Sequence, residues 1–427
     1  MDKEKKIVVI GLGYVGLPLA VALARTFQVL GFDIDTVRVG ELSCGKDRTK
    51  EVESNRLKRS SLRYSADESD MYGADVYIIT VPTPVSADSQ PDLSAVRNAS
   101  KIVGKALCEG AVVVYESTVY PGVTEDVCGP ILEQMSGLKC GKDFFLGYSP
   151  ERINPGDRKH TIDKITKVVA GQTPRVADDL CRMYGAITSG GVFQAANIRT
   201  AEAAKVIENA QRDINIAFIN EVATIFHKMG ISIQDVLDAA STKWNFLDFR
   251  PGLVGGHCIG VDPFYLAHAA VAVGHHPEIV LAGRRINDAM GPYVAECIAS
   301  ELAQQGRGAG SRILVLGLTF KENVPDLRSS RVIDIITALK ARGFKVDVHD
   351  CFADADEAKH EYNVELLSSL NGASGYHCVV GAVAHKEYTT FETADFAKLA
   401  VPDAVVADVK GIWRMIDLPD DYRRWQL

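Results

Sequence analysis

Over the first 195 residues, short apolar runs alternate with amphipathic stretches, and this alternation limits the possible folds more than any other feature of the chain. The apolar runs predict buried strands, and the stretches between them, such as 17–26 and 93–107, predict helices. The expected strands are 7–10, 29–33, 76–81, 112–116, 144–148 and 167–170. Alternating strands and helices favour parallel βαβ units with right-handed crossovers, so we expect an α/β fold.

After residue 200 the pattern changes, and near the C-terminus it returns. Residues 200–229 contain no Gly or Pro and keep a helical periodicity, which predicts one helix of about 30 residues. After a boundary-like segment at 305–310, the sequence of 312–323 is similar to that of 6–16, which suggests an internal repeat. We therefore predict two Rossmann-like doubly wound domains joined by a long central helix and a helical domain. The predicted domains are 1–197, 198–306 and 307–427.

A glycine motif lies between the first expected strand and the first expected helix. It comprises Gly11, Gly13, Tyr14, Val15 and Gly16. Such glycines let the backbone approach a pyrophosphate, which a helix N-terminus attracts. Asp33, 20 residues after Gly13, is placed to accept hydrogen bonds from adenosine ribose hydroxyls. A carboxylate disfavours a 2′-phosphate, so we expect NAD rather than NADP, although Arg38 nearby weakens that preference. The alternative is a tight turn without a ligand.

Two further expected strands end in residues that suit a ligand-binding edge. Pro82 and Thr83 follow strand 76–81, and Thr118 follows strand 112–116. Ligands bind at the carboxyl ends of parallel strands in this architecture. A hydroxyl at Thr118, beside the nicotinamide, could hold a reacting oxygen or a water. For Pro82 and Thr83 a rigid turn is the alternative.

Cys258 lies in a glycine-rich segment, between Gly255 and Gly260. Glycines remove side-chain bulk and expose the sulfur and its backbone. Asp262 and Pro263 look like a helix start, and a thiol at the entry to a helix has a lowered pKa and can act as a thiolate nucleophile. The alternative, a small buried hydrophobic side chain, is the interpretation we prefer for the other eight of the nine cysteines.

On the long helix, polar residues follow one another at spacings of three and four, so they share one face. They are Glu202, Lys205, Asn209 and Arg212 or Asp213. A solvated stripe of charge is the alternative. Because Asn209 is a poor helix former flanked by apolar residues, we expect Lys205 and Asn209 to belong to a ligand site instead.

In the C-terminal copy of the repeat, Thr319 and Phe320 replace the glycines of a dinucleotide loop, so this loop is not expected to bind NAD in the same way. Lys321 follows directly, and Arg328 adds a second basic group further along. These two cations could bind a different diphosphate. Ordinary surface charge is the alternative.

Composition excludes several classes of function. The net charge of −8 argues against binding to nucleic acid, which usually requires a basic excess. No run of about 18 apolar residues is present, so no membrane insertion is expected. The nine cysteines are scattered, which predicts neither a disulfide framework nor a metal site and favours a reducing cytoplasm.

Taken together, these segments resemble the UDP-glucose/UDP-mannose dehydrogenase family over nearly the whole chain. The segments that carry the resemblance are IGLGYVGLPLA, ITVPTP, VVYESTVYPG, GYSPERINPG, AEAAKVIENAQRDIN, KWNFLDFRPGLVGGHCIGVDP and LTFKENVPDLR. The likeness is greatest to the bacterial enzymes of the Vi-antigen type, which act on UDP-N-acetylglucosamine or UDP-N-acetylgalactosamine. The resemblance implies an N-terminal NAD domain, a central helix that builds a homodimer and a C-terminal UDP domain.

The resemblance also implies roles for individual residues. Cys258 matches the family's nucleophile. The positions that match its acid/base and water-handling residues are Lys205, Asn209, Asp262, Thr118 and Glu151. Arg250 resembles an arginine that reaches substrate across the dimer. The implied substrate-binding residues are Glu151, Arg152, Lys205, Asn209, Arg212, Arg250, Gly255, Lys321 and Arg328.

The expected reaction is the NAD-dependent, four-electron oxidation of the C6 hydroxymethyl of a UDP-N-acetylhexosamine to a carboxylate. Because the intermediate aldehyde cannot lose a second hydride until a nucleophile adds, the route passes through a thiohemiacetal and a thioester at Cys258. Asp262 or Glu151 is the expected general base. The product suits capsule, O-antigen or exopolysaccharide synthesis.

Several alternatives stay open. Gly260 stands where mannose-type enzymes commonly carry Pro or Ala, which favours an N-acetylhexosamine, with UDP-glucose and UDP-N-acetylmannosamine as other substrates. A one-step β-hydroxyacid dehydrogenase also pairs a Rossmann domain with a long helix, but it needs no thiol. A non-catalytic NAD-sensing protein should have lost Cys258, Lys205 or Thr118.

Overall fold

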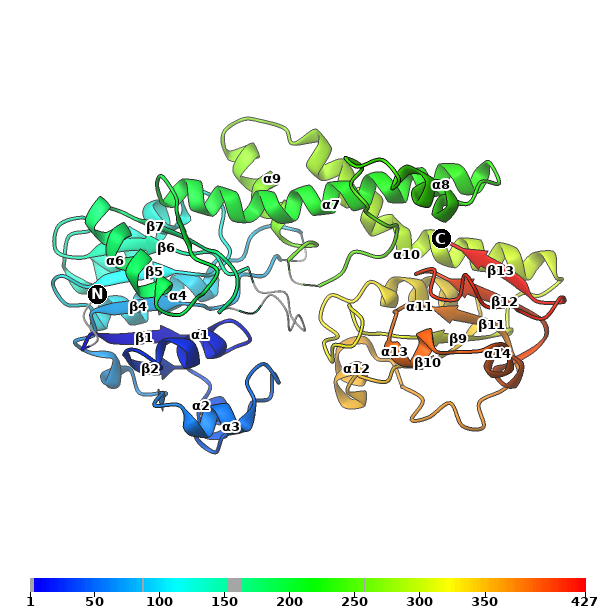
Figure 1. The fold of residues 1–427 in the computed structure, drawn as a ribbon, viewed down its shortest axis with the longest axis horizontal. Coiled ribbons are helices and arrows are strands. Elements are labelled where there is room, and N and C mark those ends of the chain that lie inside the picture. Colours follow the sequence, from blue (N-terminus) through cyan, green and yellow to red (C-terminus); the bar gives the residue numbers. More distant parts are fainter. Residues whose placement is uncertain (1–3, 87, 153–160, 162, 257) are drawn as a thin grey trace. The chain divides into compact units, whose positions relative to one another are not determined.

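The computed structural model describes residues 4–86, 88–152, 161, 163–256 and 258–427. The chain divides into two compact units, which are described separately below (Figure 1). Unit 1 consists of residues 1–208 and 264–276, and unit 2 consists of residues 209–263 and 277–427. Each unit is built around its own sheet, and helices pack against both sheets.

Unit 1 holds an eight-stranded sheet in the order β3-β2-β1-β4-β5-β6-β7-β8. In chain order its strands are β1 (Lys6–Ile10), β2 (Gln28–Phe32), β3 (Arg63–Ser65), β4 (Val76–Ile79), β5 (Val112–Tyr115), β6 (Phe145–Tyr148), β7 (Lys167–Gly171) and β8 (Val192–Gln194). Its helices are α1 (Gly16–Leu23), α2 (Thr36–Ser43), α3 (Ser54–Arg59), η1 (Glu68–Met71), α4 (Ser94–Ala106), η2 (Val123–Cys128), α5 (Gly129–Ser136) and α6 (Pro174–Gly185). All six strands predicted from the apolar runs are present, with ends shifted by up to two residues.

The sheet of unit 1 is covered on both faces, as a doubly wound fold requires. Apolar residues of α1 and α6 share a core with Val76 and Ile78 of β4. Side chains alternate between the two faces of a strand, so Tyr77 points the other way, and its hydroxyl donates to the carbonyl of Ala106 in α4 at 2.8 Å. The sheet is therefore buried between two helical layers.

One strand pair departs from the expected parallel arrangement. Strands β6 and β7 are antiparallel, with Tyr148 opposite Ala170. A parallel pair needs a crossover that carries the chain back along the sheet, usually through a helix. No helix occurs in the described residues between Tyr148 and Lys167. Because the pair is antiparallel, the first residue of β7 lies beside the carboxyl end of β6.

Unit 2 holds a five-stranded parallel sheet in the order β10-β9-β11-β12-β13. Its strands are β9 (Arg312–Leu316), β10 (Lys345–His349), β11 (Tyr376–Gly381), β12 (Ala400–Asp408) and β13 (Arg423–Gln426). Its helices are α8 (Ile233–Ala240), α10 (Glu278–Gln304), α11 (Val332–Ala341), α12 (Ala355–Tyr362), α13 (Lys386–Thr389) and α14 (Thr393–Leu399). Two helices contain residues of both units: α7 (Ile198–Lys228), which confirms the predicted long helix, and α9 (Asp262–Ala272).

The internal repeat suggested by the sequence is visible in the hydrogen bonds of the two first turns. In unit 1 the amide of Gly11 donates to the carbonyl of Phe32, and in unit 2 the amide of Gly317 donates to that of His349. The carboxylate after each second strand then closes the turn. Asp33 accepts from the amide of Leu12 at 2.7 Å, and Asp350 accepts from that of Leu318 at 2.5 Å.

Candidate active site

The glycine loop after β1 has the geometry of a pyrophosphate cradle. Gly11 has a φ of +90°, which favours glycine, and it makes the sharp turn out of β1. A Cβ on Gly16 would lie 1.9 Å from the carbonyl oxygen of Gly11, so only glycine lets α1 pack this closely. A Cβ on Gly13 would meet nothing within 4 Å, which leaves open space beside the backbone. The loop therefore fits a dinucleotide at Gly13 and uses Gly16 for packing.

Around this loop, Asp33 and Arg38 already have protein partners. Asp33 accepts hydrogen bonds from the amides of Leu12 and Asp35, and each carboxylate oxygen retains acceptor capacity for a ribose hydroxyl. Arg38 is buried, and its guanidinium donates to the Leu12 carbonyl and pairs with Asp47 at 2.7 Å. In this structure Arg38 therefore stabilises the glycine loop through the carbonyl of Leu12. Its predicted contact with the cofactor stays a prediction.

The predicted nicotinamide residues follow the carboxyl ends of neighbouring strands. Thr118 is half-buried and comes three residues after β5 ends. In the loop after β4, Pro82 is exposed and Thr83 is half-buried. The Tyr265 hydroxyl of α9 donates to the carbonyls of Thr83 and Pro84, at 3.0 and 3.3 Å. These contacts fix the loop after β4 within unit 1.

Cys258 lies in a turn that leads directly into α9. Its carbonyl accepts from the amides of Val261 and Asp262, at 3.1 and 2.9 Å, so the helical hydrogen bonding begins at the cysteine itself. Cys258 is half-buried. The burial expected for the other eight cysteines holds for Cys128, Cys297 and Cys378 and is wrong for the remaining five, of which Cys140 and Cys181 are half-buried and Cys44, Cys108 and Cys351 are exposed. The predicted helix start at Asp262 is confirmed. His257 lies outside the described residues.

The two glycines before Cys258 pack against another loop of unit 2. A Cβ on Gly255 would lie 2.7 Å from the carbonyl oxygen of Ser329, and a Cβ on Gly256 would lie 2.8 Å from the ring of Phe320. The amide of Gly256 also donates to the Ser329 carbonyl at 3.3 Å. The absence of side chains at 255 and 256 thus brings the cysteine segment onto the loop that contains Lys321 and Arg328.

Polar residues on one face of α7 are buried, which excludes a solvated stripe of charge. Glu202 is 0% exposed, Lys205 6%, Asn209 3% and Asp213 0%. Of the two candidates for the last position, Asp213 shares this face and Arg212 is exposed. A helix that buries four polar side chains needs a partner for each, and these partners identify what the face does.

Two of these helix residues have buried partners within unit 2. The Asn209 amide donates to the Asp262 carboxylate at 2.5 Å, and both side chains are buried. Of this pair, Asp262 lies one helical turn beyond Cys258 along the chain. Asp213 accepts from Arg284 at 2.5 Å and from Asn287 at 2.7 Å. Sequence reasoning paired none of these residues, because they lie 53 to 74 positions apart.

In unit 1, Glu151 and Arg152 follow β6 and are both held by charged neighbours. Glu151 is 7% exposed, and its carboxylate lies 3.5 Å from the ammonium of Lys167. Arg152 forms an ion pair with Glu208 of α7. Burial lowers the pKa of Arg152, although Glu151 beside it opposes that effect.

The unit 2 loop that contains the predicted diphosphate-binding cations is held by a buried Asp–His pair. His385 Nδ1 accepts from the amide of Asn323 at 2.9 Å, so the ring proton is assigned to Nε2, which faces Asp350 at 3.0 Å. The Asn323 contact fixes the segment just after Lys321. Arg328 pairs with Asp326 at 2.8 Å and is about half-exposed.

Arg250 has acidic partners in its own chain. Its guanidinium pairs with Asp248 at 2.8 Å and with Asp238 at 3.0 Å. The predicted contact with substrate across a dimer stays a prediction.

Sequence reasoning missed four buried residues that position the others: Glu116, Lys167, Asp350 and His385. Asp350 is the counterpart of Asp33 in the second copy of the repeat, and this signalled its position but not its contact with His385. Lys167 could not have been found, since a lysine that begins a strand gives no signal of burial until the neighbouring carboxylates are placed around it.

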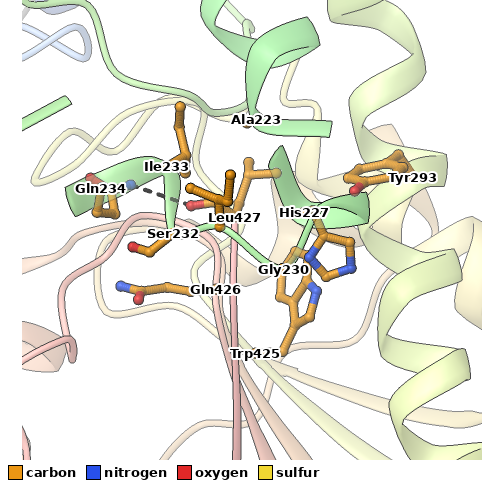
Figure 2. Close-up of a pocket in the computed structure, with 11 residues that line it drawn as sticks. Ala223, His227, Gly230, Ser232, Ile233, Gln234, Tyr293, Trp425, Gln426 and Leu427 are labelled. Carbon is orange, nitrogen blue, oxygen red and sulfur yellow. Dashed lines mark hydrogen bonds between the residues drawn. The ribbon is translucent and has the colours of Figure 1, made fainter. Parts of the chain in front are cut away.

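A pocket of about 280 Å³ lies elsewhere in unit 2, beside the C-terminal end of α7 (Figure 2). Its walls include His227, whose ring meets the rings of Tyr293 and Trp425 edge to face, each at a centroid distance of 6.3 Å. Gln234 donates to the carbonyl of Leu427 at its rim. None of the residues predicted for catalysis or binding lines this pocket, so we do not assign it to the active site.

In the described part of the chain, no helix is both long enough and apolar enough to cross a membrane. Among the same residues, no group of three or more His, Cys, Asp or Glu side chains is arranged to hold a metal ion.

Comparison with known families gives matches along most of the chain. Residues 5–188 match the NAD binding domain of the UDP-glucose/GDP-mannose dehydrogenase family, residues 199–289 match its central domain, and residues 314–415 match its UDP binding domain. Together these three matches cover well over half of the chain, and they lie in the same order as the three predicted domains.

Individual proteins are similar over nearly their full length. The chain is 51% identical to Protein CapL of Staphylococcus aureus, over 99% of this chain and 100% of that protein. It is 49% identical to the UDP-N-acetyl-D-glucosamine 6-dehydrogenase of Pseudomonas aeruginosa, over 96% and 97% of the two chains. Among solved structures, the UDP-D-ManNAc dehydrogenase of Pyrococcus horikoshii superposes with a TM-score of 0.89 at 28% identity, covering 98% of both chains.

Proposed function

The chain belongs to the UDP-glucose/GDP-mannose dehydrogenase family and is an NAD-dependent oxidoreductase, and we propose that it oxidises the C6 hydroxymethyl of a UDP-N-acetylhexosamine to a carboxylate. UDP-N-acetylglucosamine is the first candidate substrate, because a relative 49% identical over 96% of the chain carries that activity in its name. UDP-N-acetylgalactosamine, UDP-N-acetylmannosamine and UDP-glucose are the alternatives. A screen of these four UDP-sugars that follows NADH absorbance decides between them.

The observation that carries the proposal is the placement of Cys258. A half-buried thiol at the turn into α9 stands where the helix N-terminus favours negative charge. One turn further on, the buried pair of Asn209 and Asp262 adds a hydrogen-bond donor and a carboxylate. A one-step alcohol dehydrogenase would need no thiol at this position.

The glycine loop and Asp33 would hold NAD, which when bound would supply the hydride acceptor for both oxidations. The Cys258 thiolate adds to the carbonyl carbon of the intermediate aldehyde, which gives a thiohemiacetal that can be oxidised to a thioester. Lys205 and Asn209 are proposed to stabilise the oxyanions that form at this carbon. Water then attacks the thioester, a carboxylate takes its proton, and Cys258 leaves as thiolate. Glu151 and Asp262 are the two candidates for that base.

The test is Cys258→Ala, with Cys351→Ala, an exposed cysteine of the same unit, as the control. We expect Cys258→Ala to bind NAD with unchanged affinity and to release no uronic acid from UDP-N-acetylglucosamine by mass spectrometry. Cys351→Ala should form the acid at the wild-type rate. Full acid formation by Cys258→Ala would show that the covalent route is wrong.

We also propose that the enzyme is a homodimer, as the family resemblance implies. Within unit 2, α7 exposes Phe218 (60%) and Ile225 (47%), which are seven residues apart and so share one face, and Met229 (62%) follows directly after the helix ends. Such a row of large exposed apolar side chains is typical of a protein interface.

Sedimentation velocity at micromolar concentration tests the dimer. The wild type should sediment as a dimer, and the double variant Phe218→Lys with Ile225→Lys should sediment as a monomer. Met415→Lys, at an 87% exposed position of the same unit, is the control and should leave the dimer intact. A monomeric wild type would rule the proposal out.

All nine cysteines are free, which suits a reducing compartment such as the cytoplasm. We propose that the uronic acid product serves surface-polysaccharide synthesis, on the strength of the resemblance to the Vi-antigen type.

A further inference from the structure

At the carboxyl edge of the unit 1 sheet, three charged side chains meet in a fully buried cluster. Glu116 follows β5, Glu151 follows β6, and Lys167 begins β7, so the cluster joins three adjacent strands. Lys167 is 0% exposed, Glu116 1% and Glu151 7%. This is the edge at which the cofactor binds in a doubly wound sheet, and Thr118 lies two residues beyond Glu116.

Lys167 is the centre of the cluster. Its ammonium lies 2.9 Å from the carboxylate of Glu116 and 3.5 Å from that of Glu151. The other oxygen of Glu116 accepts from the Tyr184 hydroxyl of α6 at 2.5 Å, and the ammonium lies 5.1 Å from the Tyr184 ring. The antiparallel pairing of β6 and β7 makes this arrangement possible, because it places the start of β7 at the carboxyl end of β6.

The orientation of Glu151 is fixed at both of its oxygens. Oε1 accepts from the amide of Arg152 at 2.6 Å, and Oε2 faces Lys167. Among the described residues, the charged or titratable groups identified around Glu151 are Lys167 from β7, Glu116 from the end of β5, Tyr184 from α6 and Arg152, its neighbour in sequence. A carboxylate held in this way keeps one fixed orientation, and a general base needs such an orientation to reach the proton that it removes.

The cluster holds two carboxylates around one ammonium. A buried arrangement of this kind contributes little to the free energy of folding, because its charges lose their hydration. Taking charges out of water costs several kcal/mol per ion, and replacing a buried ion pair with apolar side chains is often neutral or stabilising. Burial raises the pKa of Glu116, and although burial alone would lower it, the two carboxylates raise the pKa of Lys167. Lys167 therefore stays charged, and the cluster keeps a cation that stability alone does not require.

We propose that Lys167 is a positioning residue that holds Glu151 in place as the base for thioester hydrolysis, with Glu116 as the second anchor of the ammonium. This inference rests on the proposed function. In the step concerned, a water oxygen bonds to the thioester carbonyl carbon and Glu151 takes the water proton. The carbon–sulfur bond breaks, its electron pair leaves with the Cys258 sulfur, and the products are a carboxylic acid and a thiolate.

Lys167→Met tests the proposal. Removing the cation makes ionisation of the neighbouring carboxylate harder, so the acid limb of the kcat profile should move up by about one pH unit. Hydrolysis should become the slowest step, so an acyl adduct at Cys258 should accumulate and appear by mass spectrometry of the quenched enzyme. Lys167→Arg keeps the charge and should restore part of the wild-type profile.

Glu116→Gln gives an independent test in the opposite direction. It removes the second carboxylate that pairs with Lys167, so the ammonium interacts with Glu151 alone. The acid limb of the kcat profile should therefore move to lower pH. Tyr115→Phe is the matched control, because it removes a buried hydroxyl contact with Ser100, 2.7 Å away, without touching the cluster. The control should keep the wild-type profile and NAD affinity.

The outcomes separate this inference from the proposed function. If the wild type reduces no NAD with any UDP-sugar, the proposed function is wrong. If the wild type forms acid while Lys167→Met keeps both the wild-type profile and an adduct-free Cys258, Lys167 has no role in hydrolysis. If Lys167→Met fails to fold, which loss of NAD binding would report, Glu116→Gln decides alone. An unshifted pH profile of kcat in Glu116→Gln then overturns the inference. An adduct that accumulates in an Asp262 variant but not in Lys167→Met would also overturn it, by assigning the base to Asp262.

Discussion

Two glycines in the loop after β1 differ in what an added methyl group would meet. At Gly13 a Cβ has open space, while at Gly16 it would collide with the backbone of Gly11. We therefore expect Gly13→Ala to keep wild-type stability and to bind NAD about tenfold or more weakly, a loss of about 1.4 kcal/mol. Gly16→Ala should lower the free energy of unfolding by about 2 kcal/mol or more.

Urea unfolding and NAD titration of the two variants check this pair of predictions. If Gly13→Ala bound NAD as tightly as the wild type, the cradle would have been assigned to the wrong part of the loop. The two variants serve as controls for each other, because each lies in the same loop and adds the same methyl group.

Glu202 makes stability depend on pH. Its buried carboxylate accepts from the amides of Gly122 and Thr124, and burial raises its pKa from 4.5 to about 7. Below pH 4.5 the carboxyl is protonated in both the folded and the unfolded chain. Between about pH 4.5 and 7 only the unfolded chain releases the proton, so stability falls as pH rises, by up to about 3 kcal/mol.

The measurement is urea unfolding of the wild type and Glu202→Gln at pH 5 and pH 8. The amide does not titrate, so the free energy of unfolding of the wild type relative to the variant should be lower at pH 8 than at pH 5. An equal difference at the two pH values would mean that Glu202 is ionised throughout this range.

At the scale of elements, the loop between β9 and α11 depends on a residue far away in the sequence. His385 accepts from the amide of Asn323 and faces Asp350. His385→Ala removes the acceptor and leaves a buried carboxylate without this partner, so the loop around Lys321 should loosen. We expect KM for the UDP-sugar to rise about tenfold, with NAD affinity unchanged.

Steady-state kinetics with each substrate varied in turn checks the prediction. His360→Ala is the control, because the His360 side chain is 85% exposed and pairs only with its neighbour Glu361 among the partners identified for it. If the KM for NAD rose as much as the KM for the UDP-sugar, His385→Ala would have disturbed the whole fold and not only the loop around Lys321.

The elements themselves were largely predictable from sequence. The buried strands were predicted from apolar runs, and α7 was predicted from a stretch without Gly or Pro. Both patterns depend only on residues that are neighbours in sequence. The antiparallel β6–β7 pair was not predicted, since pairing direction depends on a connection whose sequence carries no such pattern. The same limit applies to the candidate site. The sequence around Cys258 and Asn209 indicates a site by itself, whereas the roles of Lys167 and His385 depend on contacts with residues distant in sequence, which include Glu116 and Asn323, 51 and 62 positions away.

At the scale of the molecule, each unit repeats one architecture and uses it differently. In unit 1 the turn after the first strand keeps its glycines, and an open backbone follows at Gly13. In unit 2 the matching turn keeps Gly317 and its Asp350, but places Thr319 where the second glycine would stand. One fold thus provides a dinucleotide site in one copy and a loop with Lys321 in the other. The division into three domains, with 198–306 as the central one, stays a prediction.

The central claim is that one enzyme carries out two oxidations on the same carbon, with Cys258 holding the substrate between them. The most direct test is the stoichiometry of the wild-type reaction with limiting UDP-N-acetylglucosamine and excess NAD. Two NADH formed for each UDP-sugar consumed, with the uronic acid as the product, is the result we predict. One NADH for each UDP-sugar, with an aldehyde or ketone as the product, would contradict the account.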